Sequence, residues 1–213
     1  MKFISRKLGF NFCFGENRRL CGGGYGNLLL SHLPISAVRN FDITDGRREE
    51  RGCLRADIKI AGCTVHIFNV HLGTGFMERR RQALKLLSPK ILIDPELQGP
   101  RVLLGDFNEW TRGLASLSLS ENLLSVPLGE HLNWARTYPG LFPILHLDHI
   151  YRDPLIVLER LTLHKNRTAL IASDQLPLVG DFRPNIAKGQ KGHGLSAAVP
   201  IYESTHEQQN PCV

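Results

Sequence analysis

The alternation of apolar and polar residues predicts a protein built mainly from short β-strands. Residues 51–60 (RGCLRADIKI) alternate like a half-buried strand, and residues 63–70 (CTVHIFNV) form a more uniformly apolar run. Only Ala61 and Gly62 separate the two runs, which therefore predict a hairpin. Further strands are expected at 101–106 (RVLLGD), 145–153 (LHLDHIYRD), 154–164 (PLIVLERLTLH) and 175–182 (QLPLVGDF).

Helical periodicity is found in two segments between these strands. Residues 77–92 (MERRRQALKLLSPKIL) place Met77, Leu84, Leu87 and Ile91 at helical spacing and predict an amphipathic helix with its basic residues on the opposite face. Residues 111–124 (TRGLASLSLSENLL) predict a second, weaker helix. Because strands outnumber helices, the pattern favours an α/β or α+β sandwich.

The two ends of the chain differ from its middle. From about Arg183 onward the sequence loses apolar periodicity and gains Gly, Lys, Gln and Pro, so residues 183–213 are expected to form a flexible tail behind a domain at 1–182. The start (ISRKLGFNFCFG) is typical of a helix that ends just before a strand, with no preceding strand to which it connects. We therefore expect the domain to lack its N-terminal part.

Composition narrows the class of protein. With 213 residues, 42% of them hydrophobic and 22% charged, the chain is typical of a single soluble domain. A formal charge of +6 suits an anionic partner, although many basic proteins bind no nucleic acid. The five cysteines (13, 21, 53, 63 and 212) have no metal-binding or disulfide spacing and are expected to be reduced. Without a membrane-length apolar run or a secretory signal, the chain is expected to be cytoplasmic.

Candidate chemistry gathers where the predicted strands end. Asp106 and Asn108 follow the strand at 101–106 and are two residues apart, so an extended backbone would point them to one side. A carboxylate beside a carboxamide suits a hard cation together with water or an oxyanion. The alternative is that both residues simply begin a turn and bond to the backbone.

Other strand ends carry matching residues. Asn69 and His71 end the strand at 63–70, Asp148 lies within the strand at 145–153, and Asp174 precedes the strand at 175–182. A histidine with a pKa near neutrality suits phosphate contact or proton transfer. Four strand ends with related chemistry predict one shared site.

Several segments resemble the endonuclease/exonuclease/phosphatase (DNase-I-like) superfamily of metal-dependent phosphoesterases. The resemblance covers roughly residues 8–182, and its segments occur in the family's order: YGNLLLSHLPI, FNVHLG, LLGDFNEW, TYPG with LDHIYRD, and SDQLPLVGDF. It implies a two-sheet β-sandwich flanked by helices, the DNase-I-like four-layer fold, here without its first βαβ segment. It also implies a divalent cation, Mg²⁺ or Mn²⁺, in a cleft at one end of the sheets.

The resemblance also implies a role for each site residue. Asp106 is similar to the residue that orients or activates the attacking water and contributes to metal binding, and Asn108 to the residue that binds a phosphoryl oxygen. His71 is similar to the histidine that contacts the phosphate, with Asn69 beside it on the substrate side. Asp174 is similar to a metal-binding aspartate, and Asp148 to the carboxylate that orients a catalytic histidine.

Two departures from the family pattern predict weakened catalysis. The family has Ser-Asp-His where this chain has Ser173, Asp174 and Gln175, and an amide can contact a phosphate but does not exchange protons near pH 7. The family's principal metal-binding glutamate lies on an early strand that has no counterpart here. Glu16, in a glycine-rich loop, is interpreted as a solvated charge.

Two hypotheses therefore stay open. The first is a metal-dependent hydrolase of phosphomonoesters or phosphodiesters, with nucleic acid among the candidate substrates and with impaired turnover. The second is a non-catalytic relative that binds phosphorylated ligands or a protein partner through the residual cleft. The basic runs GRREERG and ERRRQ would suit an anionic substrate, but such runs are more often solvated faces.

Overall fold

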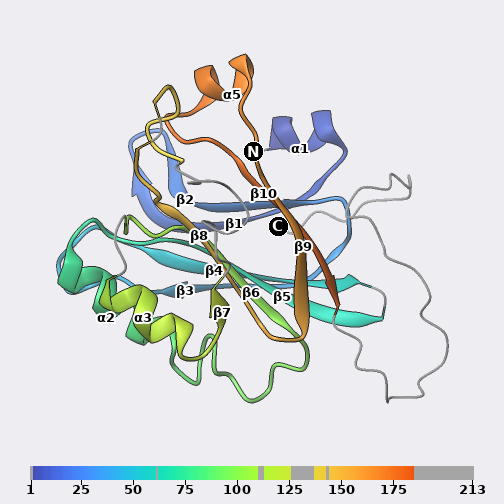
Figure 1. The fold of residues 1–213 in the computed structure, drawn as a ribbon, viewed down its shortest axis with the longest axis vertical. Coiled ribbons are helices and arrows are strands. Elements are labelled where there is room, and N and C mark those ends of the chain that lie inside the picture. The colour runs from blue at the N-terminus through green and yellow to red at the C-terminus, as the bar shows by residue number, and fades with distance from the viewer. Residues whose placement is uncertain (1, 61, 110–112, 126–136, 143, 185–213) are drawn as a thin grey trace.

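A six-stranded sheet forms the centre of the molecule. The computed structural model describes residues 2–60, 62–109, 113–125, 137–142 and 144–184. The central sheet has the strand order β3-β4-β5-β6-β8-β7, in which β5 and β6 run parallel and the other neighbours antiparallel (Figure 1). Its strands are β3 (Ile35–Asp42), β4 (Gly52–Ile60), β5 (Cys63–His71), β6 (Arg101–Asp106), β7 (Leu124–Ser125) and β8 (Asp148–Arg152).

The predicted hairpin is confirmed as β4 and β5. Its turn contains Gly62, whose φ of +81° lies in the left-handed region that glycine adopts without steric cost. The resulting register pairs Cys53 with Val70 and Ile60 with Cys63. This register places His71 at the far end of the hairpin, away from the turn.

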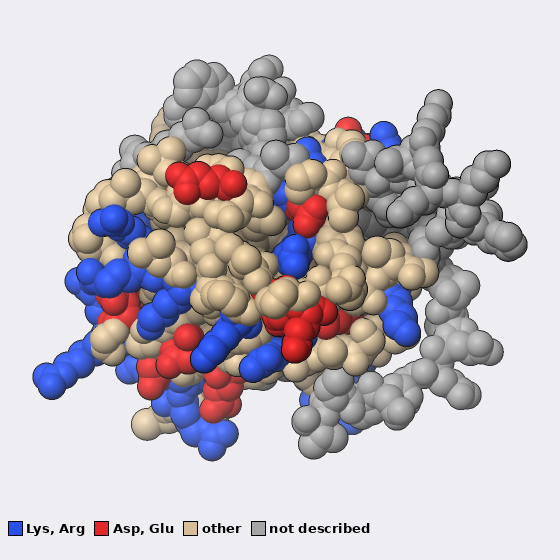
Figure 2. Space-filling view, turned by 90° about the horizontal axis from the view of Figure 1, so that it is seen from below, with Lys and Arg blue, Asp and Glu red and all other residues tan. Residues whose placement is uncertain are grey.

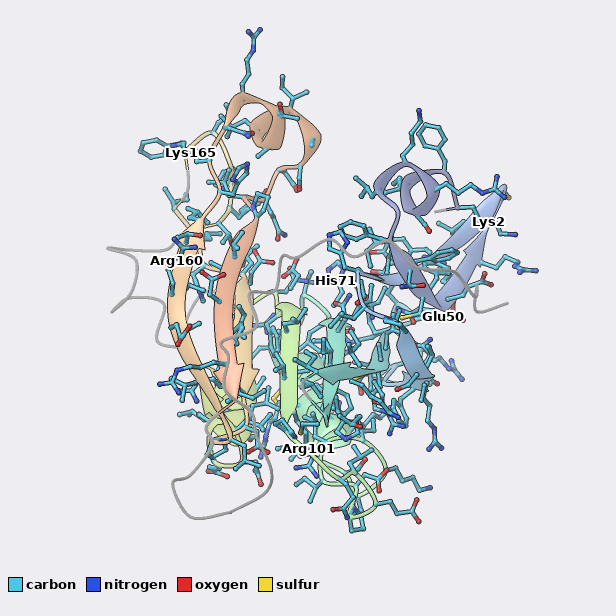
Figure 3. All side chains as sticks on the ribbon, turned by 90° about the vertical axis from the view of Figure 1, so that its right-hand side faces the viewer. Lys2, Glu50, His71, Arg101, Arg160 and Lys165 are labelled. Atoms are coloured by element: carbon cyan, nitrogen blue, oxygen red, sulfur yellow. The ribbon has the colours of Figure 1, made fainter. Side chains whose placement is uncertain are left out.

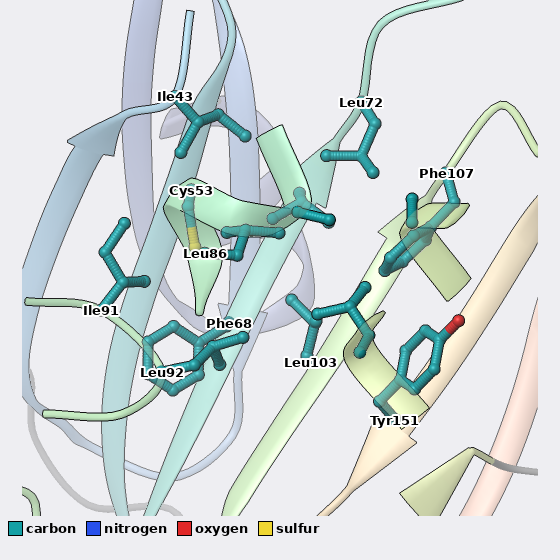
Figure 4. Packing of buried hydrophobic residues seen from close by; sticks show 14 of the residues in the cluster. Ile43, Cys53, Phe68, Leu72, Leu86, Ile91, Leu92, Leu103, Phe107 and Tyr151 are labelled. Atoms are coloured by element: carbon teal, nitrogen blue, oxygen red, sulfur yellow. The ribbon is translucent and has the colours of Figure 1, made fainter. Parts of the chain in front are cut away.

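Two helices cover one face of the central sheet. Helices α2 (Phe76–Leu86) and α3 (Leu114–Ser120) pack over the core cluster shown in Figure 4, where Phe68, Leu103 and Tyr151 come from the sheet. Side chains of both helices complete this cluster, which provides the main apolar core of the described residues.

Two hairpins cover the opposite face. The pair β1 (Asn11–Leu20) and β2 (Gly23–Ser31) packs on β4 through a small cluster that contains Leu29 and Leu54. The pair β9 (Ile156–Leu163) and β10 (Leu178–Pro184) packs on β5, β6 and β8 through a cluster that contains Val102 and Ile150. The predicted sandwich is therefore confirmed, with its second layer formed by two separate hairpins in the described residues.

Short helices form the outermost layer on the hairpin side. Figure 1 shows α1 (Lys2–Leu8) and α5 (Arg167–Ala172) on the side of the molecule opposite to α2 and α3. The order from one side to the other is thus helices, central sheet, hairpins and helices, as expected for the four-layer arrangement. The expected passage from a helix into a strand at the chain start is also confirmed, as α1 followed by β1.

The buried face predicted for the helix at 77–92 is wrong for its first half. The helix ends at Leu86, and Met77 and Leu84 are exposed, whereas Leu87 and Ile91 pack at the core beyond the helix end. Its buried face carries Ala83 and Leu86 together with polar residues that bond to the preceding loop, where Gln82 Oε1 accepts from Gly73 N at 2.8 Å. Apolar spacing could not reveal this face, because bonded polar side chains form much of it.

Other predictions concern the whole chain. Cys21, Cys53 and Cys63 carry free thiols, while Cys212 lies outside the described residues. Strand β10 continues to Pro184, two residues beyond the predicted domain end at 182, and residues 185–213 of the predicted tail lie outside the described part. Among described residues, no helix has the length and apolarity needed to cross a membrane. Cytoplasmic localisation stays a prediction.

Candidate active site

Three of the predicted site residues lie side by side at one end of the central sheet. His71 on β5 pairs with Asp106 on β6, and Asp106 pairs with Asp148 on β8. Paired residues on neighbouring strands project to the same face of a sheet. Val102 and Ile150, which share this face on β6 and β8, pack against the hairpin layer. The three side chains therefore project towards the hairpins rather than towards α2 and α3.

Asp106 is held through both of its carboxylate oxygens. Oδ1 accepts from the backbone N–H of Asn108 at 2.8 Å, and Oδ2 accepts from Gln175 Nε2 at 2.8 Å. Oδ2 also lies 3.7 Å from His71 Nε2, beyond a direct hydrogen bond. The bond from Oδ1 to Asn108 agrees with the alternative interpretation, in which Asp106 begins a turn. Oδ2, in contrast, faces residues from other strand ends, as the interpretation of a shared site predicts.

The backbone around Asp106 is unusual on both sides. Gly105 has a φ of +137°, and a Cβ at this position would lie 2.0 Å from the Val70 carbonyl oxygen. Asn108 has a φ of +50°, a left-handed conformation that asparagine tolerates better than most residues, and its Nδ2 donates to Leu72 O at 2.8 Å. Departures of this kind are frequent at functional sites.

His71 is half-buried and loosely held. Its Nδ1 lies 3.4 Å from the hydroxyl of Tyr25 on β2, and its side chain is 33% exposed. Burial lowers the pKa of His71, the positive charge of Arg51 lowers it further, and the carboxylates of Asp106 and Glu49 act in the opposite direction. A neutral ring near pH 7 is suited to accept a proton or to donate one hydrogen bond.

Asp148 carries the most perturbed carboxylate of the site. Burial raises the pKa of Asp148 to about 6, the neighbouring Thr137 side chain opposes this shift, and the charges of Asp106 and Asp174 add to it. Within the described part of the chain, Asp148 Oδ2 has no hydrogen-bond partner. An unpaired carboxylate among other carboxylates is a typical feature of catalytic and ligand-binding sites.

A cleft of about 320 Å³ opens beside Asp148. It lies between the ends of β6 and β8 and the segment that leads into β10, and its volume is at the lower end of the range for small-ligand sites. Its lining includes Asp148 and Gln175 together with the apolar side chains of Leu104, Ile150, Leu176 and Leu178.

Asn69 and Asp174 are not part of the row of paired strand-end residues, although the charge of Asp174 acts on Asp148. Asn69 Nδ2 donates to Leu28 O at 3.1 Å, so this amide bonds to β2. Asp174 is exposed, and its backbone carbonyl accepts from Gly140 N at 2.8 Å. Their proposed roles, substrate binding for Asn69 and metal binding for Asp174, stay predictions.

The described residues do not form a complete metal site. No group of three His, Cys, Asp or Glu side chains in the ranges that the structure covers is arranged to hold an ion. The unpaired Asp148 oxygen and the nearby Asp106 would suit a cation, but Asp106 already accepts two hydrogen bonds. The fit to a divalent cation is therefore only partial.

The exposed residues of the two basic runs form ion pairs. Arg81 forms a two-bond ion pair with Asp45, and Arg48 lies 3.4 Å from Glu78. Figure 2, seen from the α2 and α3 side, shows Lys and Arg side chains interleaved with Asp and Glu. For Arg48 and Arg81 the solvated, charge-balanced interpretation fits, whereas Arg51 of the first run and Arg79 of the second are buried.

Sequence reasoning missed three features of the site. It did not assign Tyr25 or Arg51, and it did not foresee that Gln175 would bond to Asp106. Tyr25 stands in the segment YGNLLLSHLPI, whose likeness to the family could have drawn attention to it. Arg51 belongs to the run GRREERG, which was considered for an anionic substrate, but nothing in the run distinguished this arginine from its neighbours.

Sequence comparison matches the chain to one family. The model of the Endonuclease/Exonuclease/phosphatase family matches residues 5–181, more than half of the chain. YbhP of Escherichia coli K12, described as uncharacterized, is 33% identical over 154 residues, or 70% of this chain and 60% of YbhP. The chain thus spans less than two thirds of the length of this curated relative.

Solved structures share the fold at low sequence identity. The mannosyl-6-phosphatase Bt3783 of Bacteroides thetaiotaomicron has a TM-score of 0.70 at 16% identity and covers 85% of this chain and 80% of its own. D. rerio TDP2 in complex with a single-strand DNA product has a TM-score of 0.66 at 17% identity, with the same coverage of 85% and 80%. These likenesses support the DNase-I-like fold.

Proposed function

This chain belongs to the Endonuclease/Exonuclease/phosphatase family, and we propose that it is a metal-dependent phosphoesterase with reduced activity. One observation carries the proposal: His71, Asp106 and Asp148 lie abreast on three adjacent strands at the sheet end predicted from the sequence. Family membership alone would also fit a chain that has lost its active site. The row of His71, Asp106 and Asp148 supports an active site that is still present.

In this proposal, Asp106 is the residue closest to the chemistry. Its Oδ2 has a lone pair beyond the one used by Gln175 and would accept a proton from an attacking water as the new P–O bond forms. The ester P–O bond breaks in the same step, and the leaving oxygen takes its proton from solvent. The second N–H of the Asn108 amide, the one not bonded to Leu72, would donate to a phosphoryl oxygen. His71 would contact the same phosphate from the neighbouring strand.

A divalent cation, Mg²⁺ or Mn²⁺, would neutralise charge on the phosphoryl group when bound. Asp106 and Asp148 are the carboxylates best placed to contribute to its binding, with Asp174 further along the rim. Because the described ligand set is incomplete, we expect weak binding, with millimolar rather than micromolar metal required. Mg²⁺ normally keeps several waters and uses few protein ligands, so weak binding is compatible with function.

Gln175 is the reason to expect reduced turnover. Its Nε2 donates to Asp106 Oδ2 and so occupies one lone pair of the proposed proton acceptor. The Gln175 amide cannot itself take up or release a proton. Asp148, whose expected role is to orient a catalytic histidine, is left with an unpaired oxygen. The same observation favours the second candidate function, a phosphate-binding protein that does not hydrolyse its ligand.

The substrate proposal is a phosphate ester, either monoester or diester. One structural relative is named as a sugar phosphatase, and another was determined with a DNA product. Nucleic acid is therefore one of the candidate substrates.

Hydrolysis of para-nitrophenyl phosphate and bis-para-nitrophenyl phosphate, with Mg²⁺ or Mn²⁺, tests the proposal. We expect slow turnover by the unsubstituted chain. Gln175→His should turn over at least tenfold faster, which corresponds to about 1.4 kcal/mol of barrier. Asp106→Ala should show no turnover. Equal inactivity of all three folded proteins would contradict the enzyme and favour the binding protein. The preferred chromogenic ester would separate monoester from diester chemistry.

A further inference from the structure

Arg51 carries a buried guanidinium whose hydrogen bonding is incomplete. The side chain is only 5% exposed, and its Nη2 donates to Glu49 Oε2 at 2.9 Å. Its Nε and Nη1 find no acceptor among the residues that the structure describes. A buried cation with unused N–H groups is costly, so its retention calls for a ligand or a function.

The position of Arg51 links it to the candidate active site. It immediately precedes β4, whose register with β5 pairs Cys53 with Val70 and so brings Arg51 to the sheet end that carries His71. Figure 3 labels His71 at this end and Arg101 at the opposite end of the sheet. The charges of both Arg51 and Glu49 also reach His71, since each perturbs its titration.

We propose that Arg51 and His71 bind a phosphate group of the substrate, and that the Glu49 carboxylate binds Arg51 in place of that phosphate when no ligand is present. A guanidinium presents neighbouring N–H groups in a planar fork that matches two phosphate oxygens, as it matches the carboxylate of Glu49. The inference rests on the proposed function, because it places the phosphate on the His71 side of Asp106.

Glu49 is suited to leave when a phosphate arrives. Its side chain is 43% exposed and lies in the loop between β3 and β4, so it gains hydration when it moves away. An ion pair with one exposed member contributes little to stability, whereas a phosphate of higher charge forms stronger bonds to the same guanidinium. Removal of the Glu49 charge should therefore strengthen phosphate binding.

A purely structural role for Arg51 makes a different prediction. If the guanidinium only packs beneath the loop and balances Glu49, substitution would alter stability without altering the affinity for phosphate. Glu49→Gln would then have no effect on phosphate either. The two roles are separated by binding measurements rather than by unfolding alone.

The test is a titration of the full chain with inorganic phosphate at constant ionic strength, followed through the ring resonances of His71 by NMR. We expect Arg51→Gln to weaken phosphate binding at least tenfold, Arg51→Lys to weaken it less, and Glu49→Gln to strengthen it about threefold. Arg101→Gln, at the opposite sheet end, and Glu50→Gln, the exposed neighbour of Glu49, are the matched controls and should leave the affinity unchanged.

Unchanged phosphate affinity in folded Arg51→Gln would overturn the inference. If Arg51→Gln fails to fold, Glu49→Gln decides, and equal affinities of Glu49→Gln and Glu50→Gln would overturn it. A second titration with dimethyl phosphate distinguishes a terminal phosphate from a diester, and either ligand supports the proposal if its binding depends on Arg51.

Phosphate binding and hydrolysis fail independently. Arg51-dependent binding without turnover would support this inference and remove the enzyme proposal. Turnover with Arg51-independent binding would do the reverse.

Discussion

Strand β5 carries the histidines of two Asp–His pairs, one towards each end of the central sheet. The two pairs differ in the distance between the side chains and in their exposure. At one end, His66 Nδ1 lies 2.8 Å from Asp57 Oδ1, and the side chains are 4% and 9% exposed. At the other, His71 Nε2 lies 3.7 Å from Asp106 Oδ2, with 33% and 16% exposed. The same residue types thus form a closed pair and an open pair.

The closed pair is the more completely bonded of the two. His66 Nε2 lies 3.1 Å from the Gln98 carbonyl oxygen, and Asp57 Oδ1 also has Arg55 Nε within 3.2 Å. With both ring nitrogens and Asp57 Oδ1 engaged and both side chains buried, this pair offers little to a ligand. Its function is to satisfy buried polar groups, so an Asp–His pair by itself does not identify an active site.

The open pair has hydrogen-bonding groups that are still available to a ligand. Asp106 accepts from Gln175 and Asn108, yet His71 stands beyond hydrogen-bond distance, and Asp148 on the next strand has an unpaired oxygen. Groups that are gathered but incompletely bonded are the ones that a substrate can engage. The difference in bonding, rather than in residue type, distinguishes the candidate active site.

The largest expected effect is on stability, at the closed end. Asp57→Ala should lower the free energy of unfolding by about 4 kcal/mol, because it leaves buried His66 without its carboxylate and Arg55 with only the more distant Asp94. Asp106→Ala should cost only about 1 kcal/mol, because the Gln175 amide can turn to solvent when its acceptor is removed. Urea unfolding of the two variants measures the contrast. Equal losses of unfolding free energy in the two variants would show that the closed pair is no more important for stability than the open pair.

A smaller effect is expected from Asp148, through pH. Its pKa of about 6 in the folded protein is above that of an unfolded aspartate, so its contribution to stability is present below about pH 4 and is lost as pH rises through 6. Asp148→Asn cannot ionise. Its stability relative to the unsubstituted chain should therefore rise by about 2 kcal/mol between pH 4 and pH 7.

The matched control for Asp148 lies at the other end of the same pair of strands. Asp153 Oδ2 is 3.6 Å from Arg101 Nη1, so this carboxylate has a cationic partner, whereas Asp148 has none among the described residues. Asp153→Asn should lower stability at pH 7 rather than raise it. Unfolding curves at several pH values for both variants provide the comparison, and parallel behaviour would contradict the role given to Asp148.

The sequence predicted six of the strands and the row of site residues because local rules determine them, whereas β2, β3 and β7 were not predicted. Alternating and apolar runs placed β4, β5, β6, β8, β9 and β10, and a turn at Gly62 determined the hairpin register that carries His71 to a strand end. Polar residues at the ends of apolar strands were expected to meet, and His71, Asp106 and Asp148 do so.

Features that depend on contacts between distant segments could not be predicted. The bond between Gln175 and Asp106 joins residues far apart in the chain, and the closed pair Asp57–His66 is indistinguishable in sequence from the open one. The buried face of α2 was missed for a related reason, since Gln82 is buried through a bond to a loop that no periodicity reveals. Bonding capacity is a property of the folded neighbourhood.

The smallest expected effect concerns the loose contact of His71. Tyr25→Phe removes a hydroxyl 3.4 Å from His71 Nδ1, a long contact at an exposed position, and should change stability by no more than about 0.5 kcal/mol. The corresponding contact at the closed end, from His66 Nε2 to the Gln98 carbonyl, belongs to a buried network. NMR titration of both histidines in Tyr25→Phe would sharpen the comparison. We expect the titration midpoint of His71 to change and that of His66 to stay the same. A shift at His66 of similar size would mean that the two ends are coupled through β5, and the open pair could then not be treated as an independent site.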